Sequence, residues 1–144
     1  MITTHQPNMP LILAVDDEAN NLQLLRHILQ DHYRLLYAKD GTRALELARQ
    51  ELPQLILLDV MMPGMTGYDV CRKLRQDERT RDTPVIFLTA KGMLMDMAEG
   101  EDAGSDLYLI KPVLATKLLN MVAMFLSDDT PLAKKRRKGT PAAG

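Results

Sequence analysis

Five short runs of apolar residues recur along the chain, and each is followed by a stretch in which apolar residues return at helical spacing. A short, continuous apolar run is typical of a strand that is buried on both faces of a parallel sheet. The runs occupy residues 11–15, 34–38, 55–58, 84–89 and 107–110. The helical stretches occupy residues 21–30, 41–51, 70–74, 93–103 and 114–125. This alternation predicts a doubly wound α/β domain, with helices on both faces of a five-stranded parallel sheet.

Length and composition fit one soluble domain. The chain of 144 residues is long enough to bury a core, and its 46% hydrophobic share excludes a disordered protein. No apolar run approaches the roughly 20 residues that span a bilayer, and the first residues lack the pattern of a secretory signal. The single cysteine, Cys71, cannot form an internal disulfide and is expected to be a buried apolar residue. We therefore expect a cytoplasmic protein without membrane contact.

The charged residues divide the chain into an acidic body and a basic end. Five consecutive basic residues occupy positions 134–138, which leaves 13 basic and 19 acidic side chains in residues 1–133. This excess of acid disfavours nucleic-acid binding over the folded surface, so any such contact is expected only through the basic end. We predict an N-terminal tail over residues 1–8, a domain over 9–127, and a basic flexible tail or linker over 128–144.

Chemically reactive residues follow four of the five predicted strands. Asp16 and Asp17 follow the first, Asp59 the third, Thr89 ends the fourth and Lys111 follows the fifth. The carboxyl ends of parallel strands meet at one edge of a doubly wound sheet, which is where such folds bind ligands. Three converging carboxylates would repel one another, and Mg²⁺, which prefers oxygen ligands, would relieve that repulsion. A carboxylate nucleophile, a metal and a lysine meet the demands of phosphoryl transfer.

Each of these residues also has an ordinary interpretation. Asp16 and Asp17 could simply begin a helix, where acids favour the positive end of the helix dipole. Asp59 could be a turn residue, Thr89 an ordinary strand-end residue and Lys111 a solvated loop lysine. Their joint occurrence at the ends of neighbouring strands, in this order, favours a functional site over four coincidences.

Four motifs at these positions resemble the receiver domain of two-component response regulators. They cover residues 15–18 (VDDE), 57–67 (LLDVMMPGMTG), 87–90 (FLTA) and 108–112 (YLIKP), and the resemblance extends over residues 9–127. It implies a flavodoxin-like fold with strand order 2-1-3-4-5, similar to the chemotaxis-type single-domain regulators. The loop after Asp59 carries Gly64 and Gly67, and we expect both glycines to adopt positive φ angles there.

The resemblance implies a role for each acidic residue of the site. Asp59 would accept a phosphoryl group from a phosphohistidine, carried by a sensor histidine kinase or a phosphotransfer protein. Asp17, Asp59 and the backbone carbonyl of Met61 would bind Mg²⁺ directly, and Asp16 would act chiefly through a bound water. Mn²⁺ is an alternative metal at such a site.

The same resemblance implies a conformational switch. Thr89 would move toward the phosphoryl group, Lys111 would contact it, and the ring of Tyr108 would turn inward; Tyr108 could equally be a half-buried strand tyrosine. The bond between Lys111 and Pro112 is similar to one that the family holds in cis. The face made by the fourth helix, the fifth strand and the fifth helix would contact a downstream output protein or domain, or a second copy of the chain.

Two alternatives to a signalling switch differ from it in the residues they need. A metal-dependent phosphohydrolase could also use Asp59 as a covalent nucleophile, but such enzymes generally need a second acid two residues later, where this chain has Met61. A receiver-like module that only binds partners usually lacks an acid or the lysine, and here neither is missing. We therefore expect a switch that assists its own phosphorylation and dephosphorylation, rather than an enzyme.

Overall fold

The computed structural model describes residues 9–90, residue 104 and residues 107–126, and within these ranges it confirms the predicted fold. Five parallel strands form one sheet in the order β2-β1-β3-β4-β5. The strands are β1 (Leu11–Val15), β2 (Arg34–Ala38), β3 (Leu55–Asp59), β4 (Val85–Thr89) and β5 (Leu107–Ile110). The helices are α1 (Ala19–Leu29), α2 (Gly41–Glu51), α3 (Gly67–Gln76) and α5 (Ala115–Leu126). The predicted helix over 93–103 and both predicted tails lie outside the described residues.

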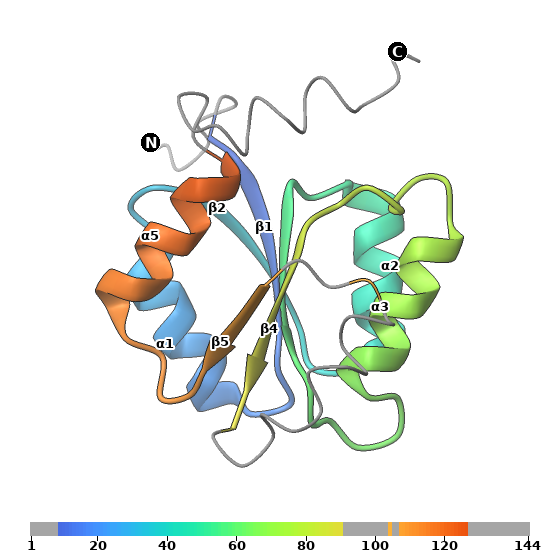
Figure 1. The fold of residues 1–144 in the computed structure, drawn as a ribbon, viewed down its shortest axis with the longest axis horizontal. Helices are drawn as coiled ribbons and strands as arrows, with labels where there is room; N and C mark the ends of the chain where they lie inside the picture. Colours follow the sequence, from blue (N-terminus) through green and yellow to red (C-terminus); the bar gives the residue numbers. More distant parts are fainter. Residues whose placement is uncertain (1–8, 91–103, 105–106, 127–144) are drawn as a thin grey trace.

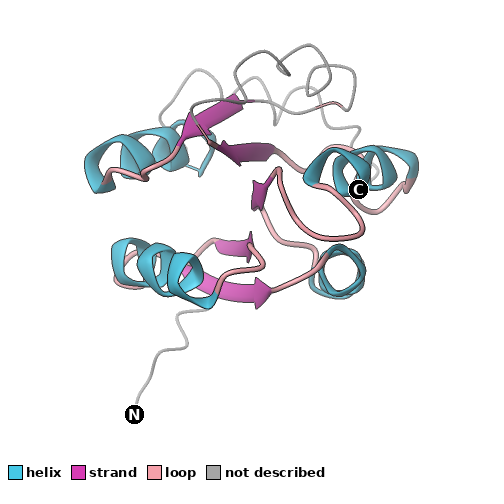
Figure 2. Ribbon diagram, turned by 90° about the horizontal axis from the view of Figure 1, so that it is seen from below, coloured by secondary structure: helices cyan, strands magenta, loops and turns pink. Residues whose placement is uncertain are grey.

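The sheet separates two hydrophobic cores. Figure 1 shows α1 and α5 on one face and α2 and α3 on the other, and Figure 2 shows the same three layers from below. The central strands β1, β3 and β4 are buried along their whole length, as their continuous apolar runs predicted. Successive side chains alternate between the two cores, so that Ile56 and Leu58 pack toward α2 and α3, whereas Leu55 and Leu57 pack toward α1 and α5.

Other sequence predictions can be checked at single residues. Cys71 is fully buried in the core beneath α2 and α3, as expected. The Lys111–Pro112 peptide bond is cis, as the resemblance implied. The first helix begins two residues earlier than predicted, at Ala19, with Glu18 as its N-cap. Asp16 and Asp17 still lie before the helix and not in its first turn. None of the described helices is long and apolar enough to cross a membrane.

A capping box starts α3 directly after the loop that follows Asp59. The Thr66 hydroxyl accepts a hydrogen bond from the Asp69 amide at 3.2 Å, and the Asp69 carboxylate accepts one from the Thr66 amide at 3.1 Å. These bonds satisfy two backbone donors that would otherwise lack helical partners. Together they fix the point at which the loop becomes a helix.

Replacing Thr66 with alanine is expected to lower the free energy of unfolding by about 1 kcal/mol, because the Asp69 amide loses its acceptor. Urea unfolding followed by circular dichroism measures this change. Thr42→Ala, on the exposed surface of α2, is the control and is expected to leave stability unchanged or slightly raised. Equal effects of the two substitutions would contradict a capping role for Thr66.

Candidate functional site

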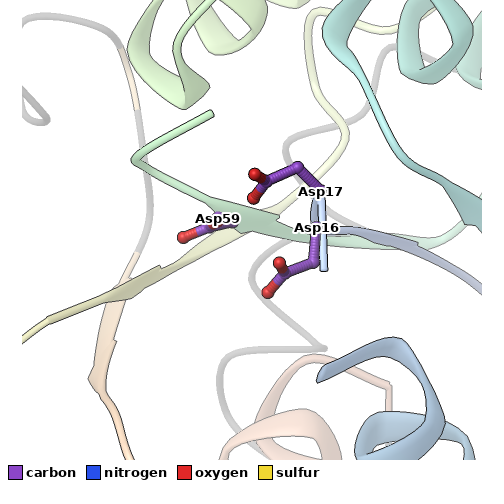
Figure 3. A group of neighbouring side chains, drawn as sticks. All are labelled: Asp16, Asp17 and Asp59. Carbon is purple, nitrogen blue, oxygen red and sulfur yellow. The ribbon is translucent and has the colours of Figure 1, made fainter. Parts of the chain in front are cut away.

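Three aspartates from neighbouring strands form an acidic cluster at the carboxyl edge of the sheet. Asp16 and Asp17 follow β1, Asp59 is the last residue of β3, and these strands pair directly. Each contributes a carboxylate oxygen, and the three oxygens lie within 4.8 Å of one another. Figure 3 shows the three side chains extending from the adjoining strand ends in the same general direction. Asp16 is fully buried and Asp59 is only 5% exposed, so water solvates these two carboxylates poorly.

Lys111 joins two of these acids through its ammonium group. Its Nζ lies 3.1 Å from Oδ1 of Asp59 and 3.2 Å from Oδ2 of Asp16. The other oxygen of Asp16 accepts a hydrogen bond from the Glu18 amide at 2.9 Å, so the Asp16 side chain is held on both sides. The lysine is therefore part of the cluster, and its interpretation as a solvated loop residue is wrong.

The pKa values of Asp59 and Lys111 are both raised, but by different causes. Burial raises the pKa of the Asp59 carboxyl from 3.8 to about 6, and the negative charge of Asp16 adds to this rise. The charge and hydrogen bond of Lys111 oppose the rise without cancelling it. Burial lowers the pKa of Lys111 itself, but the charges and hydrogen bonds of Asp59 and Asp16 outweigh burial and raise it. Near neutral pH the ammonium is thus positive beside an aspartate that is costly to ionise.

Thr89 lies on β4, which pairs with β3, and Tyr108 lies on β5, the edge strand beyond β4. Thr89 ends β4, is 2% exposed, and donates a long hydrogen bond of 3.4 Å from its hydroxyl to the Ala90 carbonyl. The backbone amide of Lys111 donates to the Thr89 carbonyl at 2.7 Å, which places the ends of β4 and β5 side by side. Tyr108 is half-buried, and its ring packs against Phe87 with centroids 5.6 Å apart. The roles of Thr89 and Tyr108 in switching stay predictions.

The loop after Asp59 confirms one prediction about glycine and corrects another. Gly64 has a φ of +79°, as expected for a sharp turn. Gly67 does not have a positive φ and instead starts α3 against the backbone of β3. A Cβ atom at position 67 would lie 2.4 Å from the Asp59 carbonyl oxygen and 2.9 Å from the Val60 Cα. Gly67 is therefore required by close backbone approach and not by a left-handed conformation.

The family-level comparison agrees with this arrangement. The family model of the response regulator receiver domain matches residues 12–123. The chain belongs to this family. It is a receiver domain of the kind found in the response regulators of two-component systems.

Solved receiver structures share the fold of this chain. The chemotaxis protein CheY4 of Vibrio cholerae is 34% identical with a TM-score of 0.78, over 82% of this chain and 99% of that one. The receiver domain of sensor histidine kinase PA1611 from Pseudomonas aeruginosa PAO1 is 30% identical with a TM-score of 0.75, over 81% of this chain and 97% of that one. That structure has a magnesium ion coordinated in its active-site cleft.

Curated relatives are longer response regulators. The DNA-binding dual master transcriptional regulator RpaA of Synechocystis is 42% identical over 130 residues, which are 88% of this chain and 54% of that protein. The response regulator PleD of Caulobacter vibrioides is 45% identical over 103 residues, or 71% of this chain and 23% of PleD. This receiver thus spans about half or less of the length of these relatives.

The acidic cluster of this receiver has the chemistry to hold a divalent metal. Asp16, Asp17 and Asp59 offer hard oxygen ligands at close range, and Lys111 is the positive side chain that contacts two of them. Mg²⁺ binds carboxylate and carbonyl oxygens together with waters, so this donor set fits it. Met61 follows Asp59 by two residues, and its side chain is 57% exposed. Coordination by its carbonyl stays a prediction.

Sequence reasoning missed the aromatic support of Tyr108. Phe87, in β4, packs against Tyr108 on one side and edge-on against Tyr68 of α3 on the other, with centroids 5.1 Å apart. Phe87 is fully buried, and the register of β4 and β5 sets it directly opposite Tyr108. The apolar run at residues 84–89 identified Phe87 as core, but its aromatic partners depend on strand order and on the placement of α3.

Proposed function

We propose that this receiver accepts a phosphoryl group on Asp59, with Mg²⁺ bound beside it, and that phosphorylation changes the surface it offers to a partner. The observation that carries the proposal is the position of Lys111, whose ammonium lies about equally close to Asp59 and Asp16. A cation between the nucleophile and a buried acid can stabilise negative charge that is brought to Asp59.

The transfer step follows from the chemistry of the carboxylate. An Asp59 oxygen forms the new O–P bond as the P–N bond of a donor phosphohistidine breaks, and the imidazole nitrogen keeps the electron pair. Lys111 and the Thr89 hydroxyl then donate hydrogen bonds to phosphoryl oxygens. A bound Mg²⁺ would supply further positive charge beside those oxygens and would offset the repulsion among the three carboxylates. The protein's contribution is mainly position and charge, as phosphoryl transfer requires.

Phosphorylation would act on the protein through Thr89 and Tyr108. The hydrogen bond that the Thr89 hydroxyl donates to the Ala90 carbonyl is long, at 3.4 Å, so a phosphoryl oxygen would be a better acceptor. Movement of Thr89 would alter the space beside Tyr108, whose ring is half-buried on the adjacent strand. We propose a sensor histidine kinase or phosphotransfer protein as the phosphoryl donor. The downstream partner would be an output protein, an output domain or a second copy of the chain. The proposed location of this switch is the cytoplasm.

Intact-mass spectrometry after incubation with Mg²⁺ and acetyl phosphate tests this function. A single labile phosphoryl adduct is expected on the wild type, and none is expected without Mg²⁺ or on Asp59→Asn. Asp69→Asn is the matched control, because Asp69 lies on α3 in the capping box and outside the acidic cluster. That variant should still be phosphorylated.

The negative outcomes are also informative. A folded wild type that forms no adduct and does not bind beryllofluoride would refute phosphoryl acceptance, and would favour a module that only binds partners. An adduct that persists on Asp59→Asn would place the phosphoryl group on another residue.

A further inference from the structure

Arg75, in the last turn of α3, holds together backbone segments that are far apart in the sequence. Its Nε donates a hydrogen bond to the Gly104 carbonyl at 2.8 Å. Its Nη1 donates to the Thr83 carbonyl at 2.6 Å and to the Arg81 carbonyl at 3.2 Å. Thr83 directly precedes Pro84 and β4, whereas Gly104 lies three residues before β5. One guanidinium therefore binds the segments that lead into two neighbouring strands.

The turn at Gly104 is shaped to receive this side chain. Gly104 has a φ of +89°, a conformation that L side chains rarely adopt. A Cβ atom there would lie 2.9 Å from Cγ and 3.0 Å from Nε of Arg75. The planar guanidinium presents donors at fixed angles, so one arginine can bind carbonyls from two segments in a way that the single ammonium of lysine does not match.

The two segments that Arg75 joins lead into β4 and β5, the strands whose far ends carry Thr89 and Lys111. The Pro84 carbonyl accepts a hydrogen bond from the Ile56 amide at 2.9 Å, so the start of β4 is also fixed to β3. From there β4 and β5 run in parallel, with Thr89 opposite Ile110. At the far end β4 supplies Thr89, and the chain that leaves β5 supplies Lys111. A shift of β5 relative to β4 would thus change the position of the lysine against the acidic cluster.

We propose that Arg75 is a positioning residue for the phosphoryl site: it sets β5 against β4 and so places Lys111 between Asp59 and Asp16. The carboxylates of the acidic cluster come from the ends of β1 and β3. The carbonyls that Arg75 binds belong instead to the segments leading into β4 and β5. Loss of the guanidinium should therefore separate two properties of the site. Metal binding should persist, whereas chemistry that depends on Lys111 should weaken.

Two variants and one control test this inference. Arg75→Met removes the donors, and Arg75→Lys keeps the charge but loses the planar fork. Lys73→Met removes an exposed positive charge from the same helix and serves as the control. Two quantities are measured at a temperature where all variants are folded: the Mg²⁺ affinity, and the rate of phosphorylation by acetyl phosphate at saturating Mg²⁺. This second quantity rests on the proposed function.

The expected result is a split between the two quantities. Both Arg75 variants should bind Mg²⁺ within about twofold of the wild type, whereas their phosphorylation rate should fall about tenfold, since small misplacements of catalytic groups have large effects on rate. Lys73→Met should change neither quantity. A parallel loss of Mg²⁺ affinity and rate, or a rate equal to that of Lys73→Met, would overturn the proposal.

Hydrogen exchange without metal or phosphoryl donor tests the structural half of the inference by itself. Amides in β5 should exchange about tenfold faster in both Arg75 variants than in Lys73→Met, while amides in β1 and β3 keep their rates. A uniform increase across all strands would mean that Arg75 only stabilises the domain, and would overturn its positioning role. A wild type that is never phosphorylated would instead count against the proposed function. Hydrogen exchange would still test whether the contact of Arg75 with Gly104 holds β5 in place.

Discussion

Replacing Gly67 with alanine is expected to destabilise the protein by about 3 kcal/mol or more, a large part of the stability of a domain of this size. The added Cβ would lie 2.4 Å from the Asp59 carbonyl oxygen and 2.9 Å from the Val60 Cα. Both are backbone atoms of the segment that ends β3, so no side-chain rotation can relieve the overlap. The start of α3 or the end of β3 must move, and Asp59 would move with it.

Gly64→Ala is the matched control for this prediction. Gly64 has a positive φ, but a Cβ atom added there would have no neighbouring atom within 4 Å, so alanine meets conformational strain without a clash. We expect it to cost about 1–2 kcal/mol, the usual penalty for a left-handed L-residue. Urea unfolding at fixed pH compares the two variants. A Gly64 variant that is as unstable as the Gly67 variant would show that close approach is not the constraint at position 67.

The two glycines illustrate how far the sequence can predict the site. The sequence places both in one turn and suggests one reason for both, and that reason holds only for Gly64. The constraint on Gly67 comes from β3 and α3 packing together, which depends on tertiary structure. The same is true of Arg75, whose bond to Gly104 joins residues 29 apart in the chain. No local pattern in the sequence predicts such a contact, because the periodicity of apolar residues reports helices and strands and not which distant residues meet.

The fold itself was predictable because the signal for its strands is local. A continuous apolar run such as Leu55–Leu58 is typical of a strand that is buried on both faces of a parallel sheet, and these residues are fully buried. The order of the strands is different, because alternation alone does not say which strand lies at an edge. That order followed from the resemblance to receivers and is confirmed here. Similarly, strand ends identified Asp59 and Lys111, but the contact between their side chains could be seen only in the folded chain.

Asp59→Asn is expected to be more stable than the wild type at pH 8 in the absence of metal. The pKa of Asp59 is raised from 3.8 to about 6 in the folded protein, first by burial and then by the charge of Asp16. The protonated carboxyl therefore stabilises the fold below about pH 4, and this contribution is lost as the pH rises through about 6. Asparagine stays neutral throughout. The shift corresponds to at most about 3 kcal/mol, and relaxation around the ionised carboxylate should reduce the gain to about 1–2 kcal/mol.

Asp77→Asn is a control of the opposite sign. Hydrogen bonds from Arg79 lower the pKa of Asp77 to about 2, so its ionised form stabilises the fold above about pH 4 and this contribution is lost on acidification. The Asp77 variant should thus be less stable than the wild type at pH 8, with a difference that Mg²⁺ leaves unchanged. For Asp59→Asn, added Mg²⁺ should reduce or reverse the gain, because the wild type binds the metal more tightly in its folded state.

Urea unfolding of the three proteins at pH 5 and pH 8, with EDTA or with Mg²⁺, measures these differences. The gain of Asp59→Asn should be small at pH 5 and larger at pH 8 in EDTA. If the variant is instead less stable than the wild type at pH 8 without metal, the ion pair with Lys111 stabilises Asp59 by more than burial and Asp16 oppose it. In that case the metal-free site would already be satisfied by its lysine. Mg²⁺ would then have to displace Lys111 from Asp59 in order to bind. The stability that Mg²⁺ adds to the wild type would therefore be smaller than for a cluster whose carboxylates repel one another.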